Sequence, residues 1–190
     1  MAKIVSETVY FENPGPQNTE ETLKLAKKRA DKLGIRNIVV ASTTGETGAK
    51  ASKLFKNYNL IIVTHVTGFK KPGTQELLPK HHTTIQNNGA KILTTAHAFG
   101  TLGRAINKKF QTIQIDGIIS NVLRLISQGT KVACEISCMA TDAGLIRTGE
   151  DIIAVGGTKS GADTALLLKP TNTHSFFNLK LKEIICKPHL

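Results

Sequence analysis

The chain has 190 residues, of which 40% are hydrophobic and 21% charged, and its formal net charge is +11 at pH 7. This length suits one well-buried core and is short for two full domains, so we expect a single domain over residues 1–190. No run of about 18 apolar residues occurs, which excludes a membrane-spanning helix and leaves no membrane among the expected partners. The N-terminus lacks a basic stretch followed by an apolar one, so the expected compartment is the cytoplasm.

The excess of positive charge is the one unusual feature of the composition, and it suits a partner rich in phosphate. The lysines are dispersed, aromatic residues make up only 5% of the chain, and no nucleic-acid-binding module is visible. Solvation of the surface therefore accounts for most of the charge, and nucleic-acid binding is a minority alternative.

The three cysteines, Cys134, Cys138 and Cys186, fit a reducing compartment better than a disulfide framework. No histidine or further cysteine stands near them at metal-ligand spacing. We interpret them as buried apolar residues and expect no metal site.

The chain predicts strands that alternate with helices, as a mainly parallel α/β sheet requires. In its first half the expected elements are an arm or short edge strand at 4–11, a helix from a capping box at Asn18 to Leu33, a strand at 35–41, a helix from Gly48, a strand at 59–64, a helix within 77–89, a strand at 91–95 and a helix through 102–106. In its second half they are helices at 115–126 and 132–146, with a strand at 131–136 as the alternative, a core strand at 151–156, a segment at 164–169 and an edge strand at 179–182.

The loop from Ser42 to Gly48 organises this arrangement. It joins a buried, β-branched strand to a helix, and it consists almost entirely of hydroxyl residues and glycine. Such a turn leaves the first amide groups of the helix unpaired and directs the positive end of its dipole at a ligand, which favours an anion. The alternative is an ordinary turn in which a hydroxyl caps the helix, because the loop matches neither the Walker nor the dinucleotide pattern.

Three other loops carry similar residues, and all four should lie at one edge of a parallel sheet. They are 64–74, 94–100 and 156–163. Together they predict one pocket for a phosphate-bearing ligand. Within it, Lys159 lies between glycines and is expected to meet the anion, whereas His97 is interpreted as a loop histidine bonded to backbone before any catalytic role.

Four segments resemble a known family. They are Val39–Gly48, Gly149–Thr158, Phe11–Thr19 and Ala140–Leu145. They are similar to the C-terminal α/β domain of pyruvate kinase, in particular to stand-alone archaeal and bacterial proteins built from that domain. The resemblance implies a three-layer α/β/α domain whose five-stranded sheet is mostly parallel and has an antiparallel last strand.

The resemblance also implies a ligand. In allosteric pyruvate kinases the loop after the first strand of this domain holds a sugar-phosphate effector, and stand-alone relatives are associated with flavin mononucleotide (FMN). We place the FMN phosphate on the Ser42–Gly48 loop and, as a hypothesis, the flavin ring toward Thr95, His97 and Gly157. The candidate cofactor-binding residues are Ser42, Thr43, Thr44, Gly45, Glu46, Thr47, Gly48, Thr64, Thr95, His97, Gly157, Thr158 and Lys159.

Catalysis is less well supported than binding. The loops show no catalytic triad, metal cluster or pair of carboxylates at a telling spacing. Pyruvate kinase chemistry belongs to a barrel domain that alone needs about 250 residues, so the resemblance does not carry kinase activity. We therefore expect an FMN-binding protein, with a flavin-dependent enzyme and a sugar-phosphate sensor as alternatives, and leave a homo-oligomer open.

Overall fold

The computed structural model describes residues 3–189, whose strands form one mixed sheet in the order β1-β7-β6-β5-β2-β3-β4. The strands are β1 (Val9–Phe11), β2 (Asn37–Ala41), β3 (Asn59–Val63), β4 (Lys91–Leu93), β5 (Ile152–Gly156), β6 (Thr164–Lys169) and β7 (Lys180–Pro188). Strands β2 to β5 are mutually parallel, and β6 runs antiparallel to both β5 and β7. The central strands are continuously apolar because both of their faces are covered.

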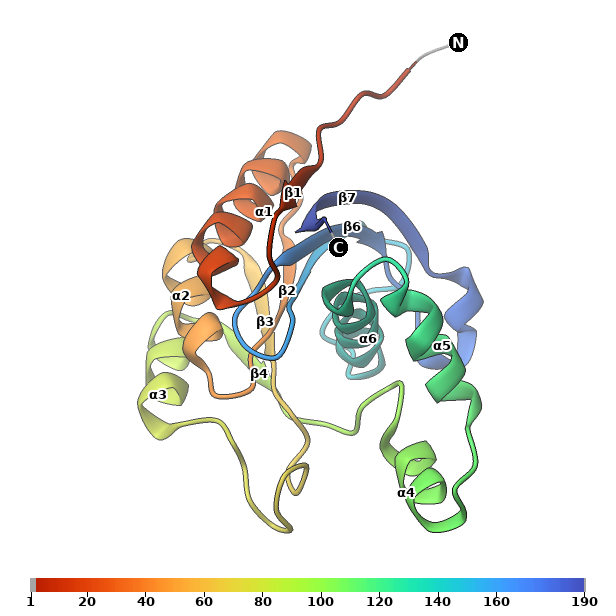
Figure 1. Ribbon diagram of the computed structural model, residues 1–190. Helices are drawn as coiled ribbons and strands as arrows, with labels where there is room; N and C mark the ends of the chain where they lie inside the picture. The colour runs from red at the N-terminus through yellow and green to blue at the C-terminus, as the bar shows by residue number, and fades with distance from the viewer. Residues whose placement is uncertain (1–2, 190) are drawn as a thin grey trace.

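Helices cover the sheet on both faces, which gives the three layers expected (Figure 1). The helices are α1 (Thr19–Leu33), α2 (Glu46–Leu54), α3 (Pro79–Asn87), α4 (Thr101–Phe110), α5 (Ile115–Arg124), α6 (Gln128–Asp142), and the short 3-10 helices η1 (Pro16–Asn18) and η2 (Thr173–Asn178). Helices α1 to α3 enclose one hydrophobic core with the sheet, and α6 encloses the other. None of the helices described is long and apolar enough to cross a bilayer.

The sheet has seven strands, not the five that the family resemblance implied. Strand β7 extends to Pro188 and is not an edge, because β1 pairs with it in parallel through Val9 and Cys186. The antiparallel strand that interrupts the parallel order is β6, and it is the next-to-last strand of the chain. The short edge strand expected within residues 4–11 is β1, but its short alternating pattern could not show which strand it pairs with.

The capping box predicted at Asn18 was also wrong, whereas the helix predicted across residues 131–136 is confirmed over its strand alternative. Asn18 has helical backbone angles and no side-chain cap bond, and its side-chain Nδ2 instead donates to the Asn13 carbonyl at 2.7 Å. The 131–136 segment is helical, since α6 begins at Gln128 behind a Ser127 cap whose Oγ accepts from the Thr130 amide at 2.9 Å. The two helices predicted for residues 115–146 are present as α5 and α6.

The cysteine prediction is confirmed. All three thiols are free and buried, and burial raises the pKa of each to about 12. Among residues 3–189 no group of three or more metal-ligating side chains comes together.

Asp163 ties the N-terminal arm to the loop after β5. Its carboxylate is fully buried and accepts the amides of Gly15 and Thr158, each at 3.1 Å, and the Thr164 hydroxyl at 2.9 Å. A buried carboxylate is stable only with such donors, so three chain segments are fixed by one side chain.

We expect Asp163→Ala to lower the free energy of unfolding by about 2–4 kcal/mol, because buried donors lose their acceptor. Urea denaturation measures the change. Asp31→Ala, which removes an exposed carboxylate, is the control and should cost far less. An equal loss in both variants would contradict the anchoring role of Asp163.

Candidate functional site

The pocket lies where the chain reverses its direction across the sheet. From β2 the chain adds β3 and β4 on one side, and it then returns to place β5 on the other side of β2. In open parallel sheets such a switch point leaves a crevice outside the carboxyl ends of the two strands. A cavity of about 670 Å³ occupies this position, between the loops that follow β2 and β5.

Most of the predicted site residues line this cavity. Those that do are Ser42, Thr43, Thr44, Glu46, Thr47, Thr64, His97, Gly157 and Lys159. The other four candidates, Gly45, Gly48, Thr95 and Thr158, do not reach its wall. The topology therefore brings together loops that are more than 100 residues apart in sequence.

Two glycines of the loop after β2 allow the loop to pack closely against neighbouring side chains. Gly45 has a φ of 93°, and a Cβ there would lie 2.5 Å from atoms of Leu77 and His81. A Cβ on Gly48 would lie 2.7 Å from Ile62, so α2 can approach β3 only with glycine at this position. Both glycines permit this close packing, and neither lines the cavity.

Most backbone amides of this loop have no acceptor among the residues described, as in sites that bind an anion. The Ser42 amide donates to Val63 O at 2.9 Å, and the Gly48 amide donates to Ser42 Oγ at 2.9 Å. Within residues 3–189, the amides of residues 43–47 donate to no protein acceptor. They surround the N-terminus of α2, where the helix dipole adds positive potential.

Charged side chains at this end partly cancel. Glu46 stands in the first turn of α2, with Lys50 Nζ 3.6 Å from its carboxylate. Lys159 holds a φ of 61° in the loop after β5 and forms no ion pair among the residues described. Lys159 is therefore the cation of the lining that an anion can recruit without breaking an existing pair.

The opposite wall comes from α6 and is largely apolar. Val132, Ile136 and Met139 line it, with Gln128 and Glu135 at its polar margins. Glu135 forms a buried ion pair with Lys131, and burial lowers the pKa of the lysine. Because apolar helix residues carry no chemical signature, this wall could not be recognised in the sequence.

A hydrogen-bonded chain at the cavity also escaped prediction. His65 Nδ1 lies 2.9 Å from Glu76 Oε2, and His65 Nε2 lies 3.3 Å from Thr43 Oγ1. With Nδ1–H donating to the carboxylate, Nε2 is the acceptor and faces Thr43. This arrangement can accept and return a proton next to the free amides. His65 lies two residues after the end of β3, which was the only signal in the sequence.

His97 is held neutral beside this chain. Its Nε2 accepts the Val66 amide at 3.3 Å, as expected for a loop histidine bonded to backbone. Burial lowers its pKa to about 4, although the nearby Glu135 carboxylate acts in the opposite direction. The Phe69 ring stacks on the His97 ring with 5.1 Å between the ring centres, and its centre lies 4.2 Å from that of the His65 ring. His97 thus supplies polar surface to the cavity and no positive charge at neutral pH.

Comparison with known families matches residues 20–168 to the family described as pyruvate kinase, alpha/beta domain. Among solved structures, a pyruvate kinase from Cryptosporidium parvum is similar at 18% identity and a TM-score of 0.42, over 80% of this chain and 23% of that one. A second crystal structure of the Cryptosporidium parvum enzyme gives 17% identity and a TM-score of 0.40, over 80% and 22% of the two chains. The chain thus spans less than a quarter of the length of these enzymes.

The His97 ring should titrate near pH 4 when followed by its Cε1–H resonance in NMR. As the pH falls below 6.5, the unfolded chain binds a proton that the folded chain does not, so stability declines from pH 6.5 to about 4. His97→Gln identifies the resonance and should reduce the acid-induced loss. A midpoint near 6.5 would contradict the buried, neutral ring.

Proposed function

The chain belongs to the family of the pyruvate kinase alpha/beta domain, and from this premise we propose that it binds a phosphate-bearing small molecule, with FMN as the favoured ligand. The phosphate would occupy the loop after β2, on the amides of residues 43–47 and the hydroxyls of Thr43, Thr44 and Thr47. The observation that carries the proposal is that these amides have no protein acceptor among the residues described, while Thr43, Thr44 and Thr47 line a cavity at the switch point of the sheet.

The shape of the cavity favours FMN over a simple sugar phosphate. Beyond the amides lies the apolar wall of α6, with Ile136 and Met139 among its residues. A planar, largely apolar ring buries surface against such a wall, whereas a sugar exposes hydroxyls that need partners there. In this proposal the ring extends from the phosphate toward His97 and Gly157, and the sugar-phosphate sensor remains the alternative.

We also propose that these residues have no pyruvate kinase activity of their own. The seven-stranded sheet and its helices account for residues 9–188. A (β/α)₈ barrel needs about 250 residues in addition. The nucleic-acid alternative has no module in the fold to support it.

FMN should bind at least about tenfold more tightly than riboflavin, because only FMN carries the phosphate that the amides of residues 43–47 can bind. Thr44→Asp should weaken FMN binding by about tenfold, or about 1.4 kcal/mol, by placing a carboxylate in the exposed position facing the phosphate. Quenching of flavin fluorescence gives both dissociation constants.

Two controls separate the phosphate from the ring. Thr44→Asn keeps the size of the aspartate without its charge, and it should bind FMN nearly as well as the unmodified protein. Riboflavin affinity should be equal in all three proteins. Equal affinity for FMN and riboflavin would contradict the phosphate site, and preferential binding of fructose bisphosphate would favour the sensor.

A second candidate function, a flavin-dependent enzyme, is favoured by the hydrogen bonds between His65, Glu76 and Thr43. A flavin supplies hydride chemistry, and a histidine oriented by a carboxylate can supply or remove the accompanying proton. His65→Gln should then leave the FMN dissociation constant within about twofold but slow the loss of flavin absorbance on adding NADH. Absorbance that NADH never changes would contradict this candidate while leaving binding intact.

A further inference from the structure

Helix α4 projects from the lower end of the molecule (Figure 1). It carries apolar side chains that the described residues leave exposed. None of its residues is buried, and it packs chiefly against α5. Leu102 is 74% exposed and Phe110 is 63% exposed. With Ala105 and Ile106 they follow helical spacing, so they form one apolar face of an amphipathic helix.

All the charged residues of α4 are basic. Residues 77–115 contain no aspartate or glutamate, while α4 alone carries Arg104, Lys108 and Lys109. The acid packed against this helix is Asp116, whose carboxylate lies against Gly103. Apolar and cationic groups therefore lie together on this helix, and Asp116 is the acid that the described residues place against it.

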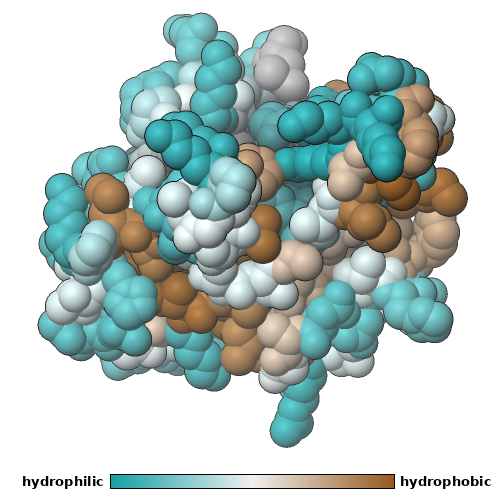
Figure 2. Space-filling view, turned by 90° about the horizontal axis from the view of Figure 1, so that it is seen from below, coloured by the Kyte–Doolittle hydropathy of each residue, from teal (hydrophilic) through white to brown (hydrophobic). Residues whose placement is uncertain are grey.

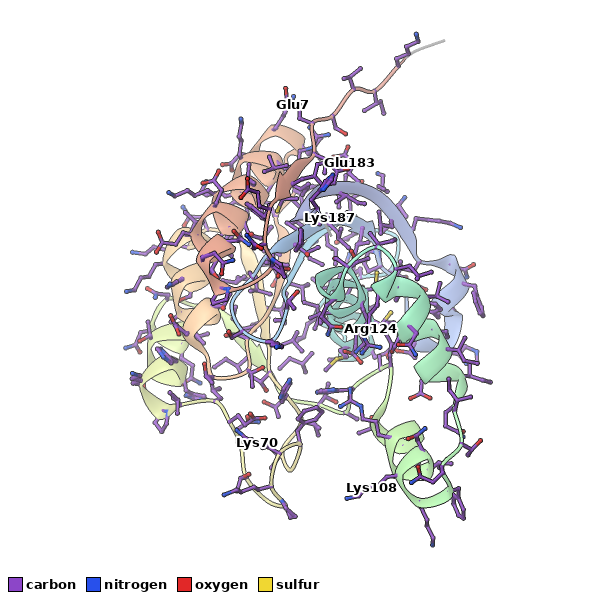
Figure 3. All side chains as sticks on the ribbon, viewed as in Figure 1. Glu7, Lys70, Lys108, Arg124, Glu183 and Lys187 are labelled. Carbon is purple, nitrogen blue, oxygen red and sulfur yellow. The ribbon has the colours of Figure 1, made fainter. Side chains whose placement is uncertain are left out.

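The loop of residues 66–74 extends this surface. The Arg104 guanidinium lies 4.9 Å from the centre of the Phe69 ring, which joins the loop to α4. Lys70 and Lys71 follow on the loop and are exposed. In Figure 3 Lys70 and Lys108 lie at the lower end of the molecule. We call the 66–74 loop and α4 together the basic end.

Seen from below, the molecule shows hydrophilic groups beside apolar ones on the side of α4 and α5 (Figure 2). Ile113 and Ile115, at the junction of the two helices, are 60% and 77% exposed and continue the apolar surface. Monomers rarely leave a contiguous apolar patch larger than a few hundred Å² without a partner.

We propose that the basic end docks on the surface of an anionic lipid bilayer. An amphipathic helix with lysines beside its apolar face lies in the plane of the interface, with the apolar side chains among the acyl chains and the cations at the headgroups. The sequence has no membrane-spanning segment and therefore predicted no membrane partner. Docking on a surface needs no such segment, and the exposure of Leu102 and Phe110 could not be read from the sequence.

The positive charge of the basic end, together with its apolar side chains, favours an anionic bilayer over a second copy of the chain and over a nucleic acid. Pairing two basic ends from two copies of the chain would bring cations of like sign together, which opposes self-association through this surface. A nucleic acid would match the cations but gives aliphatic side chains such as Leu102 and Ile113 nothing to bury against. An anionic bilayer satisfies both kinds of group, and this inference does not depend on the proposed ligand.

The test is sedimentation of the full chain with vesicles of phosphatidylcholine alone or of phosphatidylcholine mixed with phosphatidylglycerol. We expect binding to the mixed vesicles only, weakened by high salt. Lys108→Glu/Lys109→Glu and, separately, Leu102→Ser/Phe110→Ser should each reduce the bound fraction roughly tenfold. Both changes lie on an exposed helix, and circular dichroism should show an intact fold.

Lys24→Glu/Lys28→Glu on α1 is the matched control, since it makes the same change of net charge at exposed positions away from the basic end. It should bind as the unmodified chain does. Equal losses in the two charge variants would overturn the proposal in favour of general attraction. Binding to DNA that survives the Leu102→Ser/Phe110→Ser change, or a dimer abolished by it, would overturn it in favour of those partners.

Discussion

The adjacency of two parallel strands, β2 and β5, decides where the cavity of this protein lies. More than 100 residues separate them in sequence, yet they pair through Val39 and Ala154 in the centre of the sheet. Their carboxyl ends therefore open side by side, and no helix crosses between them at that edge. The cavity, the free amides of the loop after β2 and the glycines of the loop after β5 all follow from this pairing.

The same constraint explains why the site is polar on one side and apolar on the other. Short loops after the strands expose backbone and hydroxyl groups, because a tight turn leaves amides without partners. Helix α6, which covers the neighbouring face of the sheet, must be apolar toward the core, and residues at the end of that surface also line the cavity. An anion with an attached planar group matches this division.

The family match concerns the fold of the chain and not its individual side-chain contacts. The match to the pyruvate kinase alpha/beta domain family spans residues 20–168, which include strands β2 to β5 and the loop after β2. It does not account for the contacts between Thr43, His65 and Glu76, which belong to this chain's own side chains. Nor does it explain an acid-free segment with an exposed amphipathic helix.

Prediction from the sequence succeeded where the signal was local. The apolar runs of β2, β3 and β5 and the hydroxyl loop beginning at Ser42 were recognised because burial and turn formation constrain adjacent residues. It failed where partners are distant. The pairing of β1 with β7 was missed, and so was the contact of His65 with Glu76, since neither follows from spacing along the chain.

The sequence by itself therefore determined the alternation of strands and helices, the loops rich in hydroxyls and the excess of lysine. Only the tertiary structure decided that Gly45 and Gly48 do not line the cavity, that His97 is neutral, and that Leu102 and Phe110 of α4 are exposed. Neighbours far apart in sequence fix burial and hydrogen bonding, and these in turn fix pKa values and exposure.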